Sequence, residues 1–157
     1  MKKILLGLIC VMTLVGCESS GFSSKKPSES DVLKNLPGTW KVIQTVDEKG
    51  VKTDFPGEAV FVFGKQESTS DFGSNHNSSL WGYFTLTEDG EKSVTNGTWN
   101  IEPVDEDKGV FFYCQTENTY VSFHSSEYFF MITSINGSLM RWEETKSSAG
   151  FILSRVK

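Results

Sequence analysis

From residue 39 onward the sequence is a series of short segments rich in Val, Ile, Thr, Phe, Tyr and Trp, separated by residues that favour turns. These residue types are typical of β-strands, and no ten-residue stretch of this part shows the apolar stripe of an amphipathic helix. The expected strands cover residues 39–46, 58–64, 80–87, 96–102, 109–115, 118–124, 127–135, 138–144 and 150–156. The expected turns lie at Lys49-Gly50, Asp89-Gly90, Asn96-Gly97, Lys108-Gly109 and Asn136-Gly137. Many short strands joined by tight turns predict an all-β domain, either a sandwich or a barrel, with up-and-down connectivity.

Several of the expected strands are apolar on both faces, because large apolar residues follow one another without a polar residue between them. This is the case at Phe61–Phe63, at Val110–Tyr113 and at Tyr128–Ile132. Side chains alternate between the two faces of a strand, so in a barrel one set lines the interior. The other set must then be covered by loops, by a helix, by a partner or by lipid.

The start of the chain has the pattern of a secretory signal, with two lysines followed by an apolar run over residues 4–15. The run is too short for an ordinary membrane-spanning helix, which needs about 20 residues. Leu14-Val15-Gly16-Cys17 resembles the lipobox of bacterial lipoproteins. In that family the cysteine sulfur receives a diacylglycerol, the peptide is cut before the cysteine, and the new amine is acylated. The resemblance implies a signal peptide over residues 1–16 and lipidation of Cys17. The alternative is an ordinary secretory signal with a chance cysteine.

The stretch after Cys17 is rich in serine and weakly hydrophobic, which predicts a flexible tether over residues 17–35. A short helical turn is expected over residues 31–35, ending before Pro37. One acyl chain holds a protein only marginally on a membrane, whereas two or more chains on the same cysteine hold it stably. Glu18 stands where aspartate would favour the inner membrane in enteric bacteria, so the sequence favours the outer membrane over the inner membrane. We therefore expect a protein of the cell envelope that is attached to its membrane by lipid.

Removal of the signal peptide takes away Lys2 and Lys3, which leaves 13 basic and 20 acidic residues and a formal charge of −7. This balance argues against nucleic acid as a partner and against electrostatic binding to anionic lipid. Cys10 also leaves with the signal peptide, and Cys17 is used by the lipid. Cys114 then has no partner for an intramolecular disulfide, so the fold must be stable through its core alone.

The segment over residues 36–42, Leu-Pro-Gly-Thr-Trp-Lys-Val, resembles the Gly-x-Trp opening of the lipocalin-like domains found in lipoproteins of Gram-negative bacteria. The resemblance spans residues 36–157 and implies a small up-and-down antiparallel β-barrel of about eight strands. In that family the glycine permits a tight entry to the first strand, the tryptophan closes the barrel floor, and an arginine of the last strand packs across the indole. These roles of barrel closure fall on Gly38, Trp40 and Arg155.

The sequence offers little that is arranged for catalysis or for metal binding. His76 and His124 have no zinc-type spacing, and the acidic residues within 102–107 lack the ladder of a calcium loop. Cys114 with His124 could be imagined as a nucleophile and base, but a single cysteine in a strand is more often a small buried hydrophobe. We therefore expect no enzyme, no metal and no cofactor.

Our first hypothesis for the function is a barrel that binds a small apolar or amphipathic ligand. The polar segment 65–79 is then expected as a lid over the end of the barrel opposite Trp40. The candidate pocket residues are aromatic side chains: Phe61, Phe63, Trp81, Tyr83, Phe112, Tyr128 and Phe130. The alternative is a non-binding structural or protein-interaction module of the envelope with a side-chain-filled barrel. An enzyme or an enzyme inhibitor is a third hypothesis. The protein partner is not identified by the sequence.

Overall fold

The computed structural model describes residues 22, 25–67, 80–90, 93–103, 109–117, 119–124 and 128–157. This part of the chain contains one short helix, α1 (Glu29–Asn35). Its strands are β1 (Gly38–Val46), β2 (Lys52–Asp54), β3 (Ala59–Gln66), β4 (Leu80–Glu88), β5 (Ser93–Pro103), β6 (Val110–Thr116), β7 (Thr119–Tyr120), β8 (Phe129–Ile135), β9 (Leu139–Glu144) and β10 (Gly150–Arg155). The expected signal peptide and Cys17 lie outside the described residues.

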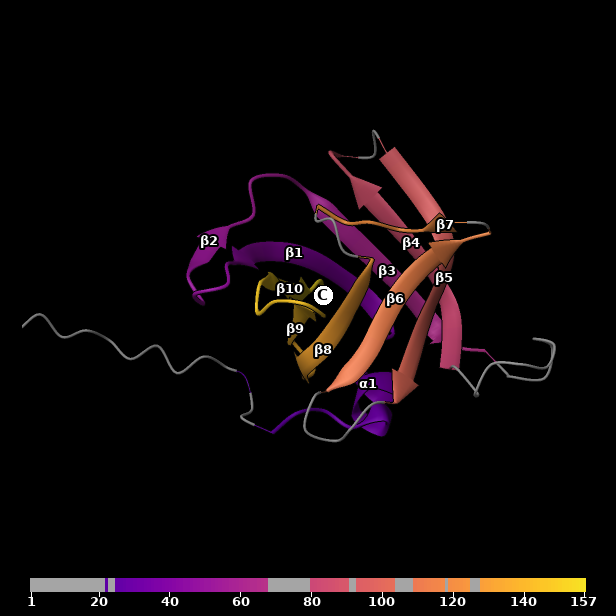
Figure 1. The fold of residues 1–157 in the computed structure, drawn as a ribbon. Helices are drawn as coiled ribbons and strands as arrows, with labels where there is room; N and C mark the ends of the chain where they lie inside the picture. The colour runs from indigo at the N-terminus through magenta and orange to yellow at the C-terminus, as the bar shows by residue number, and fades with distance from the viewer. Residues whose placement is uncertain are drawn as a thin grey trace, which may run out of the picture.

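Eight of these strands close into an antiparallel barrel (Figure 1). The order around the barrel is β1, β3, β4, β5, β6, β8, β9 and β10, and β10 pairs with β1 to complete the ring. The two shortest strands lie outside this ring, because β2 pairs with β1 and β7 pairs with β6. The all-β, up-and-down barrel expected from the sequence is therefore confirmed.

Two local expectations about the strands are wrong. Asn96-Gly97, expected as a turn, lies inside β5, where Gly97 passes so close to β6 that a Cβ would overlap the carbonyl oxygen of Gln115. A glycine inside a strand is typical of such a close backbone approach. The strand expected over residues 118–124 is reduced to the two residues of β7, and the chain after β7 crosses the end of the barrel as coil (Figure 1).

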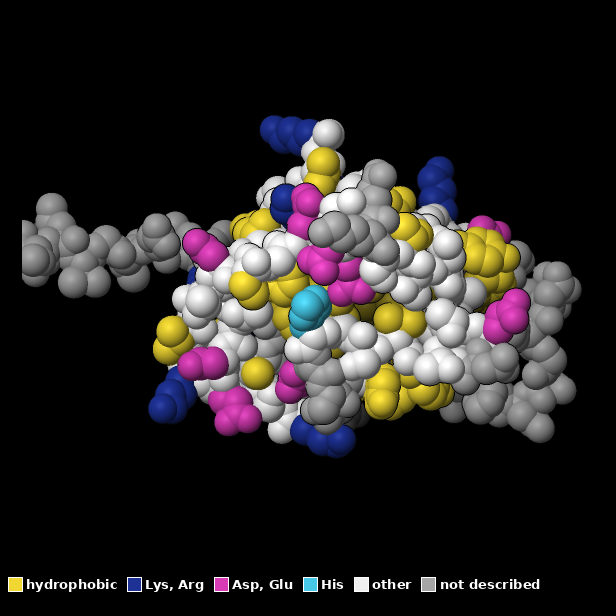
Figure 2. Space-filling model, turned by 90° about the horizontal axis from the view of Figure 1, so that it is seen from above, with side chains coloured by type: hydrophobic (Ala, Val, Ile, Leu, Met, Phe, Trp, Pro, Cys, Tyr) yellow, Lys and Arg dark blue, Asp and Glu magenta, His cyan; other side chains and the backbone are white. Residues whose placement is uncertain are grey.

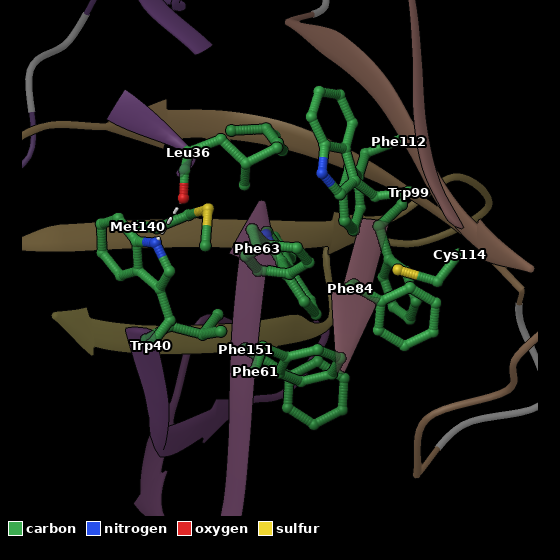
Figure 3. Close-up of a cluster of buried hydrophobic side chains, with 14 of the residues drawn as sticks. Leu36, Trp40, Phe61, Phe63, Phe84, Trp99, Phe112, Cys114, Met140 and Phe151 are labelled. Atoms are coloured by element: carbon green, nitrogen blue, oxygen red, sulfur yellow. Dashed lines mark hydrogen bonds between the residues drawn. The ribbon is translucent and has the colours of Figure 1, made fainter. Parts of the chain in front are cut away.

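The barrel interior is formed by the apolar side chains that alternate along the strands. On β3, Phe61 and Phe63 are buried, whereas Val62 between them is 45% exposed. Fully burying one large apolar side chain stabilises a fold by about 1.5–3 kcal/mol. Figure 3 shows part of this core, whose largest fully buried side chains are Trp40, Trp99, Trp142, Phe61, Phe63, Phe112, Leu36, Leu86, Ile101, Ile132, Met140 and Leu153.

Helix α1 closes one end of the barrel and is not part of the flexible tether expected over residues 17–35. The Ser28 hydroxyl accepts a hydrogen bond from Asp31 N at 3.2 Å, and the Asp31 carboxylate accepts one from Ser28 N at 3.0 Å. This capping box satisfies two backbone donors at the start of the helix. Val32 in the helix and Leu36 after it are fully buried in the core. Burial of this apolar side stabilises a helix too short to be stable alone.

Three backbone carbonyls at the C-terminal end of α1 are held by two side chains of the barrel. The Trp40 indole donates a hydrogen bond to the carbonyl of Leu36 at 2.8 Å (Figure 3). The Arg155 guanidinium donates to the carbonyls of Asn35 and Pro37, the latter at 2.8 Å. The last carbonyls of a helix lack partners within it and form the negative end of its dipole, so an arginine is favoured beside them.

Arg155 also lies across the indole of Trp40, with Cζ 4.4 Å from the ring centroid. The two residues face each other in the β1–β10 pairing that closes the ring. Gly38 leaves the space for this contact, because its φ is +132° and a Cβ would overlap Arg155 Nη1. The structure thus brings together the three residues expected to close the barrel.

We predict that Trp40→Ala lowers the free energy of unfolding by about 3–5 kcal/mol, as truncation of a large core side chain does. Arg155→Ala should cost less, and the double variant should be less damaging than the sum of the two, because each side chain loses a contact with the other. Urea denaturation of residues 18–157 measures all three variants. Strict additivity would show that the two side chains do not stabilise each other.

Candidate functional site

The barrel interior is the first candidate site, because the expected ligand pocket falls there. Phe61, Phe63, Phe112 and Phe130 are buried inside the barrel. Their rings pack around Trp142, whose centroid lies 5.0 Å from that of Phe61, 6.2 Å from Phe63, 5.1 Å from Phe112 and 5.6 Å from Phe130. Four of the seven candidate pocket residues are therefore brought together, but around another aromatic side chain of the protein itself.

The other three candidate pocket residues lie on the outside of the barrel. Tyr83 is 58% exposed, Tyr128 is 44% exposed, and Trp81 packs edge-on against Tyr83 with ring centroids 5.5 Å apart. On β4 the buried side chains are those of the even-numbered residues, such as Phe84, so Trp81 and Tyr83 point outward. The prediction that these three residues line the pocket is wrong, because a strand that is apolar on both faces does not reveal which face is inside.

The sequence did not assign Phe123, Trp142 and Phe151 to the interior, although all three are buried there. The alternation along β9, where Met140 and Trp142 are buried, could have revealed Trp142. Phe123 carries no comparable signal, since it lies in the coil between β7 and β8.

Phe123 fills the end of the barrel opposite α1. Its ring centroid lies 5.1 Å from that of Phe61 and 5.1 Å from that of Phe151. The next residue, His124, has a left-handed backbone with φ of 46°, and its Nε2 lies 3.2 Å from Glu88 Oε1. Figure 2 shows the molecule from above, with a histidine in cyan among hydrophobic side chains and acidic side chains beside it. The barrel mouth is therefore covered by a coil segment that inserts an aromatic side chain.

The polar segment 65–79 leaves the barrel at the end where α1 lies. β3 runs antiparallel to β1 and pairs Phe63 with Gly38, so Gln66, at the end of β3, lies beyond the start of β1. The described start of the segment therefore lies at the Trp40 end of the barrel, whereas the lid was expected over the opposite end. Most of its residues lie outside the part of the chain that the structure describes.

Cys114 and His124, the pair imagined as nucleophile and base, lie in different surroundings. Cys114 is buried on the inner side of β6 beside Trp99 and Phe84 (Figure 3), and burial raises the pKa of its thiol well above the usual value. The thiolate is the reactive form of cysteine, so this thiol is held in its unreactive form. His124 lies at the barrel mouth beside Glu88.

Five aromatic side chains gather on the outside of the barrel and are termed here the outer aromatic face. They come from β6, from β7, from the first residue of β8 and from the residue before it: Phe111, Tyr113, Tyr120, Phe129 and Tyr128. Neighbouring rings are in contact, with centroid distances between 5.0 and 6.4 Å. The run of apolar residues on both strand faces was the sequence signal for such a surface, and the structure now shows which residues form it.

Among the described residues, charged side chains of β5 and β9 lie beside the outer aromatic face. The Tyr113 hydroxyl donates a hydrogen bond to Glu102 Oε1 at 3.2 Å. On β9, next to β8, Arg141 Nε lies 2.8 Å from Glu143 Oε1, so these two charges offset each other. Burial raises the pKa of Tyr113 to about 12, and the negative charge of Glu102 adds to this effect.

Within the described part of the chain, no three His, Cys, Asp or Glu side chains are grouped so that they could hold a metal ion. The same part holds no helix with the length and apolar character needed to cross a membrane. No protein-family model matches the chain, and its comparison with curated proteins and with solved structures finds no match. What the protein does must therefore be inferred from its own residues.

We predict that Tyr113 titrates near pH 12 in the folded protein and that Glu102→Gln lowers this pKa, because it removes a negative charge beside the phenol. The folded pKa lies above the unfolded value of about 10, so the folded state should lose stability as the pH rises above about 10. The ultraviolet absorbance of tyrosinate measures the titration, with Tyr113→Phe as the variant that lacks it. A titration unchanged by Glu102→Gln would show that burial alone raises the pKa.

Proposed function

We propose that this chain is a lipid-anchored protein of the cell envelope whose filled barrel acts through its outer surface, as a structural or protein-interaction module. The observation that supports this best is the occupation of the interior by the protein's own side chains. Trp142 is in contact with four phenylalanine rings there, and Leu36 and Phe123 are buried toward the two ends. Eight-stranded barrels can have interiors just wide enough for side chains to fill.

The proposed anchor depends on residues 1–17, which lie outside the described residues. It is supported by the lipobox-like sequence that ends at Cys17 and by the basic and apolar residues before it. Helix α1 is capped by Ser28, and Pro27 before it is buried, so residues 18–26 remain as the spacer between the lipid and the barrel. Nine residues span at most about 32 Å when fully extended. The barrel would therefore stay within roughly its own length of the membrane.

We predict that Cys17→Ala abolishes labelling of the protein by a fatty-acid analogue in growing cells and leaves an uncut precursor, because no sulfur remains to accept the lipid. Cys114→Ala is the matched control, since that cysteine is buried in the barrel and should leave labelling unchanged. Mass spectrometry of the purified protein reports the attached lipid. Equal labelling of the wild type and Cys17→Ala would exclude the anchor.

A small apolar ligand remains a second candidate function, and two observations favour it. Phe123 enters the barrel from a coil, and a coil segment can move without breaking the strand pairing. The Trp142 Nε1 is buried without a hydrogen-bond acceptor. A ligand that displaced the Phe123 ring would meet apolar rings and one polar donor, which is the usual composition of a small-molecule site.

We predict that residues 18–157 show no saturable uptake of an apolar, environment-sensitive dye, because the interior is filled. Phe123→Ala should create such binding, since it removes the ring that contacts Phe61 and Phe151. Val62→Ala, which shortens a half-exposed side chain on the outside of β3, should not. Fluorescence titration measures all three proteins. Saturable binding by the wild type would favour the ligand-binding function over the filled module.

A further inference from the structure

We propose that the outer aromatic face lies against the surface of the lipid bilayer that holds the anchor. This inference rests on the proposed lipid anchor, and it names the contact that the outer surface of the filled barrel makes. The occupant is the headgroup and upper acyl region of a neutral, zwitterionic bilayer.

The chemistry of the outer aromatic face suits this region of a bilayer. Tyrosine combines an apolar ring with a polar hydroxyl and is enriched where membrane meets water. Phe129 lies among the other rings, 5.3 Å from Phe111, 5.6 Å from Tyr113 and 5.0 Å from Tyr120. The face therefore presents apolar rings together with three phenol groups, rather than a purely apolar surface.

Exposed apolar residues elsewhere in the described chain do not form a comparable group. The other large ones are spread over different segments: Val51, Val62, Tyr83, Val94 and Val156. Single exposed apolar residues are normal on a soluble surface, whereas a contiguous group marks a contact site. Trp81 and Tyr83 form a smaller pair of rings on β4, and β5 lies between this pair and the outer aromatic face, with Asn100 of β5 paired with both Trp81 and Tyr113.

The position of the tether favours a membrane as the occupant. Helix α1 contacts β5 and β8, the two strands that flank β6, and it lies at the end of the barrel where β6 begins (Figure 1). Phe111 is the second residue of β6 and so lies toward this end. The seven residues of β6 extend about 23 Å, and the spacer over residues 18–26 reaches about 32 Å. Every part of the outer aromatic face can therefore meet the bilayer while the anchor stays inserted.

The tether also removes the need for strong binding. A short flexible linker holds its two ends at an effective concentration in the millimolar range, so even a weak contact is populated. Without the expected signal peptide the chain has a formal charge of −7, which disfavours an anionic surface, and the Arg141–Glu143 pair beside the face is neutral as a whole. A zwitterionic bilayer therefore fits better than an anionic one.

The test uses residues 18–157 with an N-terminal histidine tag, bound to phosphatidylcholine vesicles that contain a chelating lipid. This attachment does not need acylation of Cys17, so failure of the proposed lipidation would leave the test intact. Hydroxyl-radical footprinting reports the oxidation rate of each tyrosine with and without vesicles. We expect the rates of Tyr120 and Tyr128 to fall by about threefold, because a millimolar effective concentration keeps a weak contact formed most of the time. Tyr83, which is exposed on β4, should be unchanged.

A matched pair of variants makes the test specific. Tyr120→Ser with Tyr128→Ser should abolish the protection of Phe129, whereas Tyr83→Ser with Val62→Ser removes similar exposed area elsewhere and should preserve it. Equal oxidation with and without vesicles, or equal protection of Tyr83, would overturn the proposal. Protection that appears only when envelope proteins are added would also overturn it, and would assign the face to a protein partner.

Discussion

The barrel depends on the contacts that Arg155 makes where its first strand, its last strand and its helix meet. A guanidinium that is partly removed from water needs hydrogen-bond partners, and here it binds the carbonyls of Asn35 and Pro37 and lies over the Trp40 ring. These two hydrogen bonds join residues that are separated by 118 and 120 positions in the chain. The ring of eight strands cannot close before the last strand is in place. The two ends of the domain are therefore stabilised together with its middle.

The parts of this fold that could be predicted are those encoded by neighbouring residues. Alternating apolar residues gave most strands, and the resemblance of residues 36–42 to the Gly-x-Trp opening implied the glycine, tryptophan and arginine of the closure. The orientation of Trp81 and Tyr83 could not, because both faces of β4 carry large side chains and only the pairing with other strands fixes the inside. Phe123 was missed for a different reason: its burial arises from contacts with distant strands and leaves no periodic signal.

The size of the interior side chains explains why the outer surface is the better candidate for function. Indole and phenyl rings from β3, β6, β8 and β9 meet near the barrel axis, where centroid distances of 5.0–6.2 Å are those of rings in contact. A ligand would have to displace one of these rings and replace the contacts that it loses. Since cores are close-packed, displacement of a ring held by strands is more costly than displacement of one held by coil. Phe123, whose ring contacts Phe61 at the barrel mouth, is held by coil.

The large apolar residues on both faces of some strands also explain the outside of the barrel. A strand with large apolar residues on both faces can bury only one set within the barrel, so the rings on β6 and β8 remain outside in contact with one another. Their mutual contacts cover part of this surface, and a neutral bilayer close to the tether would cover the rest.

The strands halfway round the ring of strands from β6 and β8 are β1 and β3. With the outer aromatic face on the membrane, these two strands point away from it, and the polar contacts beside them, such as the exposed Lys41–Glu58 ion pair, face water. The position of the rings would therefore determine which wall of the barrel is free to meet other molecules of the envelope.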